Sequence, residues 1–187
     1  YGDLMSRIRA IPSVTEVGGI SSFPLRGGLS NGTFLVLSSA TEQLDFSRMN
    51  EYQADPARSG NAEFRVASEG FFRAMGIPLI RGRLFEDRDV ITATPHVALI
   101  SESLAATEFP GEDAIGKHIQ FGNMDGVLTP YVVIGIVGDI RDRTLDAAAR
   151  PTFYANYRQR ARRAATFSLV VSTSGDADRV IAPVRSA

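Results

Sequence analysis

Hydrophobic and polar positions change period every few residues along this chain, and the stretch 66–89, VASEGFFRAMGIPLIRGRLFEDRD, shows the pattern most clearly. Residues 62–67 lead into it with the alternation of a strand, which places Phe64 and Val66 on one face. A short helix is predicted to follow, since Ser68 can act as an N-cap and an acidic residue suits the first turn. Its apolar face is formed by Phe71, Phe72 and Met75.

Glycine and proline residues are predicted to end the secondary-structure elements in the second half of this stretch. Gly76 is predicted to end the helix in a left-handed C-cap, and Pro78 prevents the helix from continuing. Leu79 and Ile80 then begin an extended segment that Gly82 closes. A strand, a short helix and a second strand with this many apolar residues favour a buried corner of the core over a linker.

The rest of the chain continues to interleave strands and helices. About seven to nine strands and about four short helices are predicted, which indicates an α+β fold with mixed sheets rather than a strict doubly wound one. The most hydrophobic run, YVVIGIV at 131–137, is expected to be a central strand. Residues 39–61 are polar and weakly periodic, and we interpret them as a surface excursion with a short helix. The other expected strands are 14–23, 33–37, 96–100, 117–121, 152–157 and 167–173, and the other helices are 2–11, 102–109 and a C-terminal one that Pro183 interrupts.

Glycine and serine mark three further points. Gly18 and Gly19 weaken the first of these strands or mark a bulge in it. Ser101 is expected to cap the helix at 102–109. Residues 24–32 are rich in glycine and are predicted to form a loop.

Composition places the chain among globular domains and excludes several classes of protein. Its 187 residues are 44% hydrophobic and 22% charged, enough for one domain or two small ones with a sizeable core. With 20 basic and 21 acidic residues the net charge is −1, which argues against nucleic acid or an anionic membrane surface as a partner. The absence of cysteine excludes disulfides, thiolate metal sites and cysteine nucleophiles.

The chain has no segment that approaches the roughly 18 consecutive apolar residues of a membrane-spanning helix. It begins at Tyr1 rather than at methionine and stops at Ala187 inside a predicted helix. We therefore expect a fragment of a longer protein, whose targeting signals or membrane spans can lie outside these residues.

Ser30 stands in Gly28-Leu-Ser-Asn-Gly32, which matches the G-x-S-x-G pattern of a hydrolase nucleophile elbow. That mechanism requires a strand before the serine and a helix after it, whereas here a loop precedes it and a strand follows. Two histidines, His96 and His118, could serve as bases. We interpret the segment as a hairpin loop and keep a serine hydrolase that uses Ser30 as an alternative.

The segment Gly111-Glu-Asp-Ala-Ile-Gly116-Lys117 fits a phosphate-binding Walker A loop up to its last position. His118 stands where the motif needs serine or threonine for the magnesium ion, and the two acidic residues would repel phosphate. A helix rather than a strand precedes the segment, and a strand rather than a helix follows it. Nucleotide binding is therefore not predicted, and no cofactor is expected.

Charged clusters are interpreted as surface features. The acidic segment 86–89 lacks the alternating ligand pattern of a calcium loop, and its arginine competes for the carboxylates. His96 and His118 share no metal-ligand spacing. Residues 139–143 are predicted to form an ion-paired turn, and the basic run 158–163 a solvated turn. We thus predict no catalytic, cofactor-binding or metal-binding residue in this chain.

Several motifs follow one another in the order found in a known family. They are Val66 to Phe85, Val97 to Ala105, Phe109 to Lys117 and Val133 to Arg141, with Pro24-Leu25 and Arg150-Pro-Thr-Phe-Tyr154 in matching positions. Together they cover nearly the whole chain, which closely resembles the MacB-like periplasmic core domain. In that family the domain lies between the first two membrane helices of a class of ABC-transporter permeases, and the group of duplicated orphan permeases is the most similar.

The resemblance implies a single core domain, residues 1–187, with two lobes. A porter-like α+β subdomain would comprise residues about 1–67 and 139–187, and an inserted lobe about 68–138. In that arrangement the stretch 66–89 marks the crossover into the inserted lobe. Phe71, Phe72 and Met75 would then pack the junction between the lobes.

The resemblance also implies a function. We expect a non-catalytic extracytoplasmic domain of an ABC-type efflux or export permease, on the periplasmic face of the inner membrane, that transmits conformational change and contacts substrate or partner proteins. Expected partners are the transmembrane helices of the parent permease, a separate ATPase subunit or domain, and periplasmic adaptor proteins or a second permease half, but no nucleic acid. The isolated fragment is expected to be soluble. The alternative is a stand-alone extracytoplasmic module that binds a small ligand or peptide between its lobes.

Overall fold

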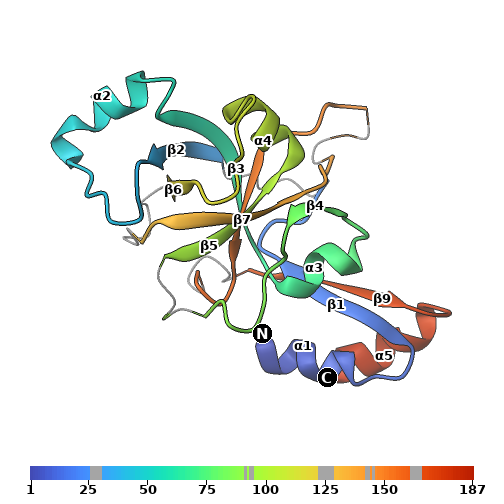
Figure 1. Cartoon of the computed structure of the whole chain (residues 1–187). Helices are drawn as coiled ribbons and strands as arrows, with labels where there is room; N and C mark the ends of the chain where they lie inside the picture. Colours follow the sequence, from blue (N-terminus) through green and yellow to red (C-terminus); the bar gives the residue numbers. More distant parts are fainter. Residues whose placement is uncertain are drawn as a thin grey trace.

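The computed structural model describes residues 1–25, 31–90, 92, 95–121, 129–141, 144, 146–160 and 166–187. In these residues nine strands form one sheet, accompanied by short helices (Figure 1). The strands are β1 (Val14–Ile20), β2 (Asn31–Leu37), β3 (Ser59–Ala67), β4 (Leu79–Gly82), β5 (His96–Ser101), β6 (His118–Phe121), β7 (Tyr131–Val137), β8 (Thr152–Asn156) and β9 (Ser168–Thr173). The helices are α1 (Gly2–Arg9), α2 (Met49–Ala54), α3 (Glu69–Ala74), α4 (Glu102–Glu108) and α5 (Asp178–Ser186), with a 3-10 turn η1 (Phe46–Arg48) before α2.

The strand order is β2-β6-β7-β5-β8-β3-β1-β9, with β4 attached to β7. Because β2 pairs with β3 as well as with β6, the strands β2, β6, β7, β5, β8 and β3 close into a ring. The β5–β7 and β3–β8 pairs are parallel, whereas the β1–β3, β1–β9, β2–β3 and β2–β6 pairs are antiparallel. Closure leaves the ring strands without a free edge, and β1 and β9 extend the sheet outward from β3.

This mixed α+β architecture confirms the fold class predicted from the sequence. The run 131–137 forms β7, which pairs with β4, β5 and β6 and is the interior strand expected. Ser101 caps α4, since its hydroxyl accepts a hydrogen bond from Leu104 N at 3.2 Å. The polar segment 39–61 contains the expected short helix, α2, although residues 59–61 already belong to β3. Among the described residues, none of the helices has the length and apolar character needed to span a membrane.

The hydrophobic core consists of two clusters of buried residues, each of which contains several aromatic rings in contact. In the first, the rings of Phe34, Phe64 and Phe153 surround Phe121, with centroids 6.0, 5.0 and 5.1 Å away. The second lies around α3, where Phe72 contacts other rings edge to face. Burying such side chains is the main favourable term in folding, so the ring and α3 each have a core of their own.

The stretch 66–89 is only partly the buried corner that its sequence predicts. Phe71 and Phe72 are fully buried, and Gly76 has a φ of +66°, as expected beyond the end of a helix. β4, in contrast, is exposed along its whole length, with Leu79 at 41% and Ile80 at 45%. The prediction of burial was wrong for β4, because this strand lies outside the ring and its described pairing is with β7 alone.

Ser68 occupies the N-cap position of α3, as the sequence predicts, but its side chain makes no capping hydrogen bond to the helix. Its hydroxyl accepts a hydrogen bond from Gly19 N at 2.9 Å, and its own N donates to the Gly19 carbonyl at 2.9 Å. The side chain therefore ties the end of β3 to β1. A partner strand that is distant in sequence has replaced the local backbone as the partner of this hydroxyl.

Gly18 and Gly19 do not mark a bulge in β1. The irregularity in the pairing of β1 with β9 lies between Val14 and Glu16 instead. A Cβ atom on Gly18 would lie 2.1 Å from Phe71 N and 2.3 Å from the Gly70 carbonyl carbon. Gly18 is needed because the backbone of α3 lies directly against β1 at this point.

Candidate functional site

A polar cavity of about 400 Å³, called the α1 cavity below, lies against one face of α1. Its other walls come from three segments that are distant in the sequence. These are Glu69 at the start of α3, Asp87 in the loop after β4, and Tyr157 with Arg158 after β8. The cavity is therefore a place where four separate parts of the chain meet.

Arg158 is the centre of the ion pairs at the α1 cavity. Its Nη2 lies 2.9 Å from Asp87 Oδ1 and 3.4 Å from Glu69 Oε1. Its backbone N donates to Asn156 Oδ1 at 2.9 Å, which fixes the start of the turn. Burial raises the pKa of the Tyr157 phenol, and the charge of Glu69 raises it further, so this group stays protonated at neutral pH.

This arrangement can hold the loop after β4 and the start of α3 next to α1 through charge. The Arg158 side chain is 33% exposed and that of Asp87 89%, so solvent screens their attraction. A pair of this kind contributes on the order of 0–1 kcal/mol. Such pairs break and re-form readily, which suits a contact that differs between two states of a protein better than one that anchors the fold.

A second set of polar contacts, which is partly or fully buried, holds the loop after β4. Arg83 donates twice to the Asp89 carboxylate, at 2.8 and 2.9 Å. Asn156 Nδ2 donates to the Asp89 carbonyl at 3.2 Å, and Gln159 Nε2 donates to the Val90 carbonyl at 3.1 Å. The prediction of a solvated acidic loop is wrong for Asp89, which is 3% exposed. Bidentate pairing with an arginine allows the carboxylate to be buried.

Replacement of Asp89 by asparagine is expected to lower the free energy of unfolding by about 2 kcal/mol at neutral pH. Burial disfavours the Asp89 carboxylate, but hydrogen bonds from Arg83 and from the Glu86 amide outweigh it and lower the pKa below the ordinary value of 3.8. A carboxyl whose pKa is lowered in the folded state stabilises the fold above its unfolded-state pKa and loses this contribution as pH falls through the folded value. Urea unfolding of parent and variant between about pH 7 and pH 3 measures both effects.

Glu86→Gln is the matched control for this substitution. The Glu86 side chain is 47% exposed and pairs with Arg88 at 2.8 Å, and its Oε1 lies 3.9 Å from Arg83 Nη1. The substitution removes an exposed carboxylate from the same loop and leaves both hydrogen bonds between Arg83 and Asp89 in place. We expect a change within about 0.5 kcal/mol. An Asp89→Asn protein that keeps the stability and the pH dependence of the parent would show that the buried pair does not stabilise the loop.

The catalytic candidates of the sequence are not assembled into a site among the described residues. Ser30 lies outside those residues. His96 is on β5 and His118 on β6, with β7 between them. His96 packs edge to face on the Tyr131 ring, with the centroids 5.8 Å apart. Within the described ranges, no group of three or more His, Asp or Glu side chains is placed to hold a metal ion.

The segment that partly matches a phosphate loop has its charges paired already. Lys117 Nζ lies 2.5 Å from Glu112 Oε2, and Arg81 Nη2 lies 2.7 Å from Asp113 Oδ2. β6 begins at His118, directly after the segment, as the strand prediction requires. The lysine that the motif would offer to phosphate is thus held by an acid of its own loop.

The basic run 158–163 is not a solvated turn where the structure describes it. Arg160 is 4% exposed, and its guanidinium lies over the rings of Phe64 and Tyr131, 5.6 and 5.7 Å from their centroids. Gln159 is also buried, and its Oε1 accepts a hydrogen bond from the start of β5. The prediction failed because the aromatic partners of the run come from β3 and β7, which the local sequence does not contain.

The turn after β7 is described only in part. Asp139 Oδ1 accepts a hydrogen bond from Ser103 N at 3.0 Å, in the first turn of α4. Residues 142 and 143 lie outside the described residues, so the ion-paired turn at 139–143 stays a prediction.

Comparisons with known proteins agree with one another. The family model of the MacB-like periplasmic core domain matches residues 2–187. The periplasmic region of MacB from Actinobacillus actinomycetemcomitans is similar with a TM-score of 0.62 at 17% identity, over 98% of this chain and 70% of that one. The extracellular domain of the ABC-type transporter YknZ from Gram-positive bacteria is similar with a TM-score of 0.55 at 14% identity, over 96% and 75%. At such identities the two structures show a shared fold. No curated protein matches the chain.

Proposed function

Because the chain belongs to the family of MacB-like periplasmic core domains, we propose that it transmits conformational change between the membrane helices of a permease and substrate or proteins outside the membrane. Membership of the family makes it the periplasmic, extracytoplasmic domain of an ABC-type transporter permease. It therefore works with membrane helices and an ATPase partner. We also propose that the domain is non-catalytic and that adaptor proteins or a second permease half bind it, since a mechanical role needs contacts but no turnover.

The connections of α1 and α5 support a mechanical role. α1 leads into β1 and β9 leads into α5, and the two strands pair in antiparallel fashion from Val14 opposite Thr173 onward (Figure 1). Beyond this pair, Ser174 N donates to the Ser13 carbonyl at 2.9 Å. The two helices are thus attached to neighbouring ends of one strand pair. A displacement of either helix would move β1 and β9 together. Because β1 pairs with β3, the displacement would also be transmitted to the ring.

We propose that the domain is divided into two lobes, residues about 1–67 with 139–187 and residues about 68–138. The α1 cavity supports this division, because Glu69 and Asp87 come from the middle segment and the other walls from the end segments. The ring contains β2, β3 and β8 from the end segments and β5, β6 and β7 from the middle one, so strand pairing joins the two lobes.

The contacts of Arg158 are the observation that carries the proposal, since they join the segments by ion pairs that contribute little to stability. Arg158→Ala is expected to change the free energy of unfolding by less than about 1 kcal/mol. In the complete transporter we expect it to abolish an ATP-dependent shift of a few ångströms between α1 and the loop after β4. Spin labels on cysteines introduced at Arg7 and Arg88 measure that distance in a transporter whose cysteines outside these 187 residues have been replaced; residues 1–187 contain none.

Arg48→Ala is the matched control, since Arg48 is an exposed arginine that pairs with Glu51 at 2.8 Å on the distant α2. It should leave the ATP-dependent shift intact. A parent transporter whose label distance is the same with and without ATP would contradict a mechanical role for the α1 cavity. Saturable ATP binding by the isolated chain, measured by calorimetry, would contradict the assignment of ATP hydrolysis to a separate partner.

A second candidate function is that of an extracytoplasmic module that binds a small ligand or peptide between its lobes. The α1 cavity favours it, since about 400 Å³ lies within the usual range of small-molecule sites. Its charged lining suits a peptide of mixed charge better than an apolar ligand. A saturable rise in the Tm of the isolated chain with such a peptide would favour binding over the mechanical role.

A further inference from the structure

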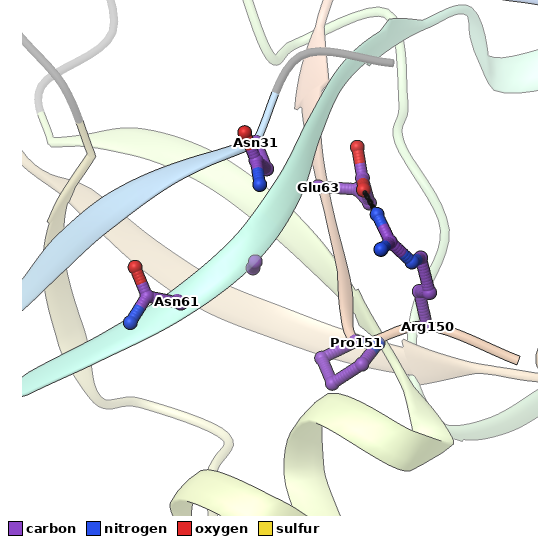
Figure 2. Close-up of a pocket in the computed structure, with 6 residues that line it drawn as sticks. Asn31, Asn61, Glu63, Arg150 and Pro151 are labelled. Atoms are coloured by element: carbon purple, nitrogen blue, oxygen red, sulfur yellow. Dashed lines mark hydrogen bonds and ion pairs between the residues drawn. The ribbon is translucent and has the colours of Figure 1, made fainter. Parts of the chain in front are cut away.

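A second cavity, of about 240 Å³, lies where β2, β3 and the segment before β8 meet (Figure 2). Asn31 begins β2, and Asn61 and Glu63 lie on β3, while Arg150 and Pro151 come from the segment before β8. Asn31 is paired with Glu63 across the antiparallel strands, and Asn61 lies two residues before Glu63. The three side chains therefore share one face of the sheet. We call this cavity the Glu63 pocket.

The Glu63 carboxylate is buried and only half satisfied. The residue is 3% exposed, and its Oε1 accepts a hydrogen bond from Arg150 Nη1. Its Oε2 has no hydrogen-bond donor among the residues that the structure describes. A buried carboxylate oxygen without a donor is costly, and a role in a site is one of the reasons for which proteins keep such a group.

The other lining groups offer hydrogen-bond donors next to this acceptor. Arg150 is 37% exposed and has five N–H donors, and its described side-chain partner is Glu63 through Nη1. Asn61 Oδ1 accepts a hydrogen bond from the Thr33 hydroxyl at 3.1 Å, which leaves its amide NH₂ as the group for a ligand. The pocket therefore presents several donors next to a buried acceptor within one small space.

The charges of the pocket select the class of ligand. The charges of Glu63 and Arg150 sum to zero. A simple anion would be repelled by the Glu63 carboxylate, and a simple cation would be repelled by the Arg150 guanidinium. A ligand that carries a positive group and an acceptor a few bonds apart satisfies both sides, through charge-assisted hydrogen bonds. The volume lies below the roughly 300–1,000 Å³ of sites for drug-sized molecules, which indicates a small ligand.

We propose that the Glu63 pocket binds the backbone of an α-amino acid. Glu63 Oε2 has almost no solvent-accessible surface in this structure, so a rotation of the Glu63 side chain toward the cavity accompanies binding and lets the α-ammonium group donate to Oε2. The carboxylate or carbonyl oxygen of the ligand accepts from Arg150, with the Asn31 and Asn61 amides beside them. Two sources share this chemistry: a free amino acid and the N-terminal residue of a peptide. The assignment goes beyond the mechanical role, which requires no ligand at this place.

Isothermal titration calorimetry on the 187-residue chain tests the site with L-alanine, the dipeptide alanyl-alanine and N-acetyl-alanine. We expect saturable binding of L-alanine or of the dipeptide. N-acetyl-alanine should bind at least about tenfold more weakly, because its nitrogen carries no charge. Binding of the free amino acid alone identifies that source, and binding of the dipeptide alone identifies a peptide N-terminus.

Three variants complete the test. Glu63→Gln keeps the shape of the side chain and is expected to weaken binding at least about tenfold. Asn31 is exposed, so Asn31→Ala should fold even if Glu63→Gln does not. We expect Asn31→Ala to weaken ligand binding about threefold. Glu112→Gln removes an exposed acid from another loop and should leave the affinity unchanged.

The proposal is overturned by any of three results. They are the absence of saturable binding of both L-alanine and the dipeptide, equal affinities for acetylated and free forms, and equal affinities of the parent and Glu63→Gln. Glu63 and Arg150 would then be an ion pair of the fold alone. None of these results bears on the ATP-dependent distance change at the α1 cavity. Ligand binding at the Glu63 pocket and the mechanical role are therefore tested independently of each other.

Discussion

Gly18→Ala is expected to lower the free energy of unfolding by about 3 kcal/mol, at the upper end of the effect of overpacking a core. A Cβ at this position would lie 2.1 Å from Phe71 N and 2.3 Å from the Gly70 carbonyl carbon. From the other side, a Cβ on Gly70 would lie 2.0 Å from the Val17 carbonyl oxygen. Both obstacles are backbone atoms, which cannot rotate away as a side chain can, so α3 must move off β1. Urea unfolding followed by circular dichroism measures the loss.

Gly175→Ala is the matched control, since a Cβ there meets no atom within 4 Å. We expect its free energy of unfolding to stay within about 0.5 kcal/mol of the parent or to rise slightly, because alanine restricts the unfolded chain more than glycine does. If Gly18→Ala were as stable as Gly175→Ala, α3 would not be held in close contact with β1.

The second large effect is expected at Phe72, whose replacement by alanine should lower the free energy of unfolding by about 4 kcal/mol. The ring is fully buried and meets Phe71, Phe85 and Tyr154 edge to face, with centroids 5.4, 6.1 and 5.2 Å away. These neighbours come from α3 itself, from the loop after β4 and from β8. Truncation therefore removes the buried area of one ring and leaves a cavity between three segments.

Ile80→Ala serves as the control for Phe72→Ala, because Ile80 is a large apolar residue of the same stretch that is 45% exposed. Its loss should cost less than about 1 kcal/mol. Equal effects of the two substitutions on urea unfolding would mean that the ring cluster around Phe72 does not hold these segments together.

Local periodicity was sufficient to predict most of the helices and strands of this chain. Two predictions were wrong: α5 continues through Pro183 instead of being interrupted there, and Asn31 and Gly32, predicted as loop, begin β2. The alternation at 62–67, the apolar run at 131–137 and the serine before 102–109 each gave the right element, because these signals lie within one turn or one strand. The ordered motifs were likewise sufficient for the family, which the match over residues 2–187 confirms. The two-lobe division at about 67 and 138 stays a prediction, as strand pairing joins both segments in the ring.

The candidate sites could not be found in this way, because their residues meet only in three dimensions. In the sequence, Glu63 is one position of a predicted strand and Arg150 is part of a family motif. The parallel pairing of β3 with β8 brings the two residues together. Arg158 was assigned to a solvated turn, yet it binds acids from α3 and from the loop after β4. A run of basic residues contains no information about the distant acids and rings that neutralise and bury it.

The sequence alone determined the fold class, most of the elements and the family, since each depends on the order of apolar, polar and glycine residues along the chain. Tertiary structure decided which of the polar residues are buried and what they bind. In the tertiary structure β4 is exposed, Asp89 and Arg160 are buried, and Ser68 at the N-cap position of α3 accepts a hydrogen bond from Gly19 instead of from the helix. The physical reason is that burial and hydrogen bonding depend on pairings between distant strands, which local propensity does not specify.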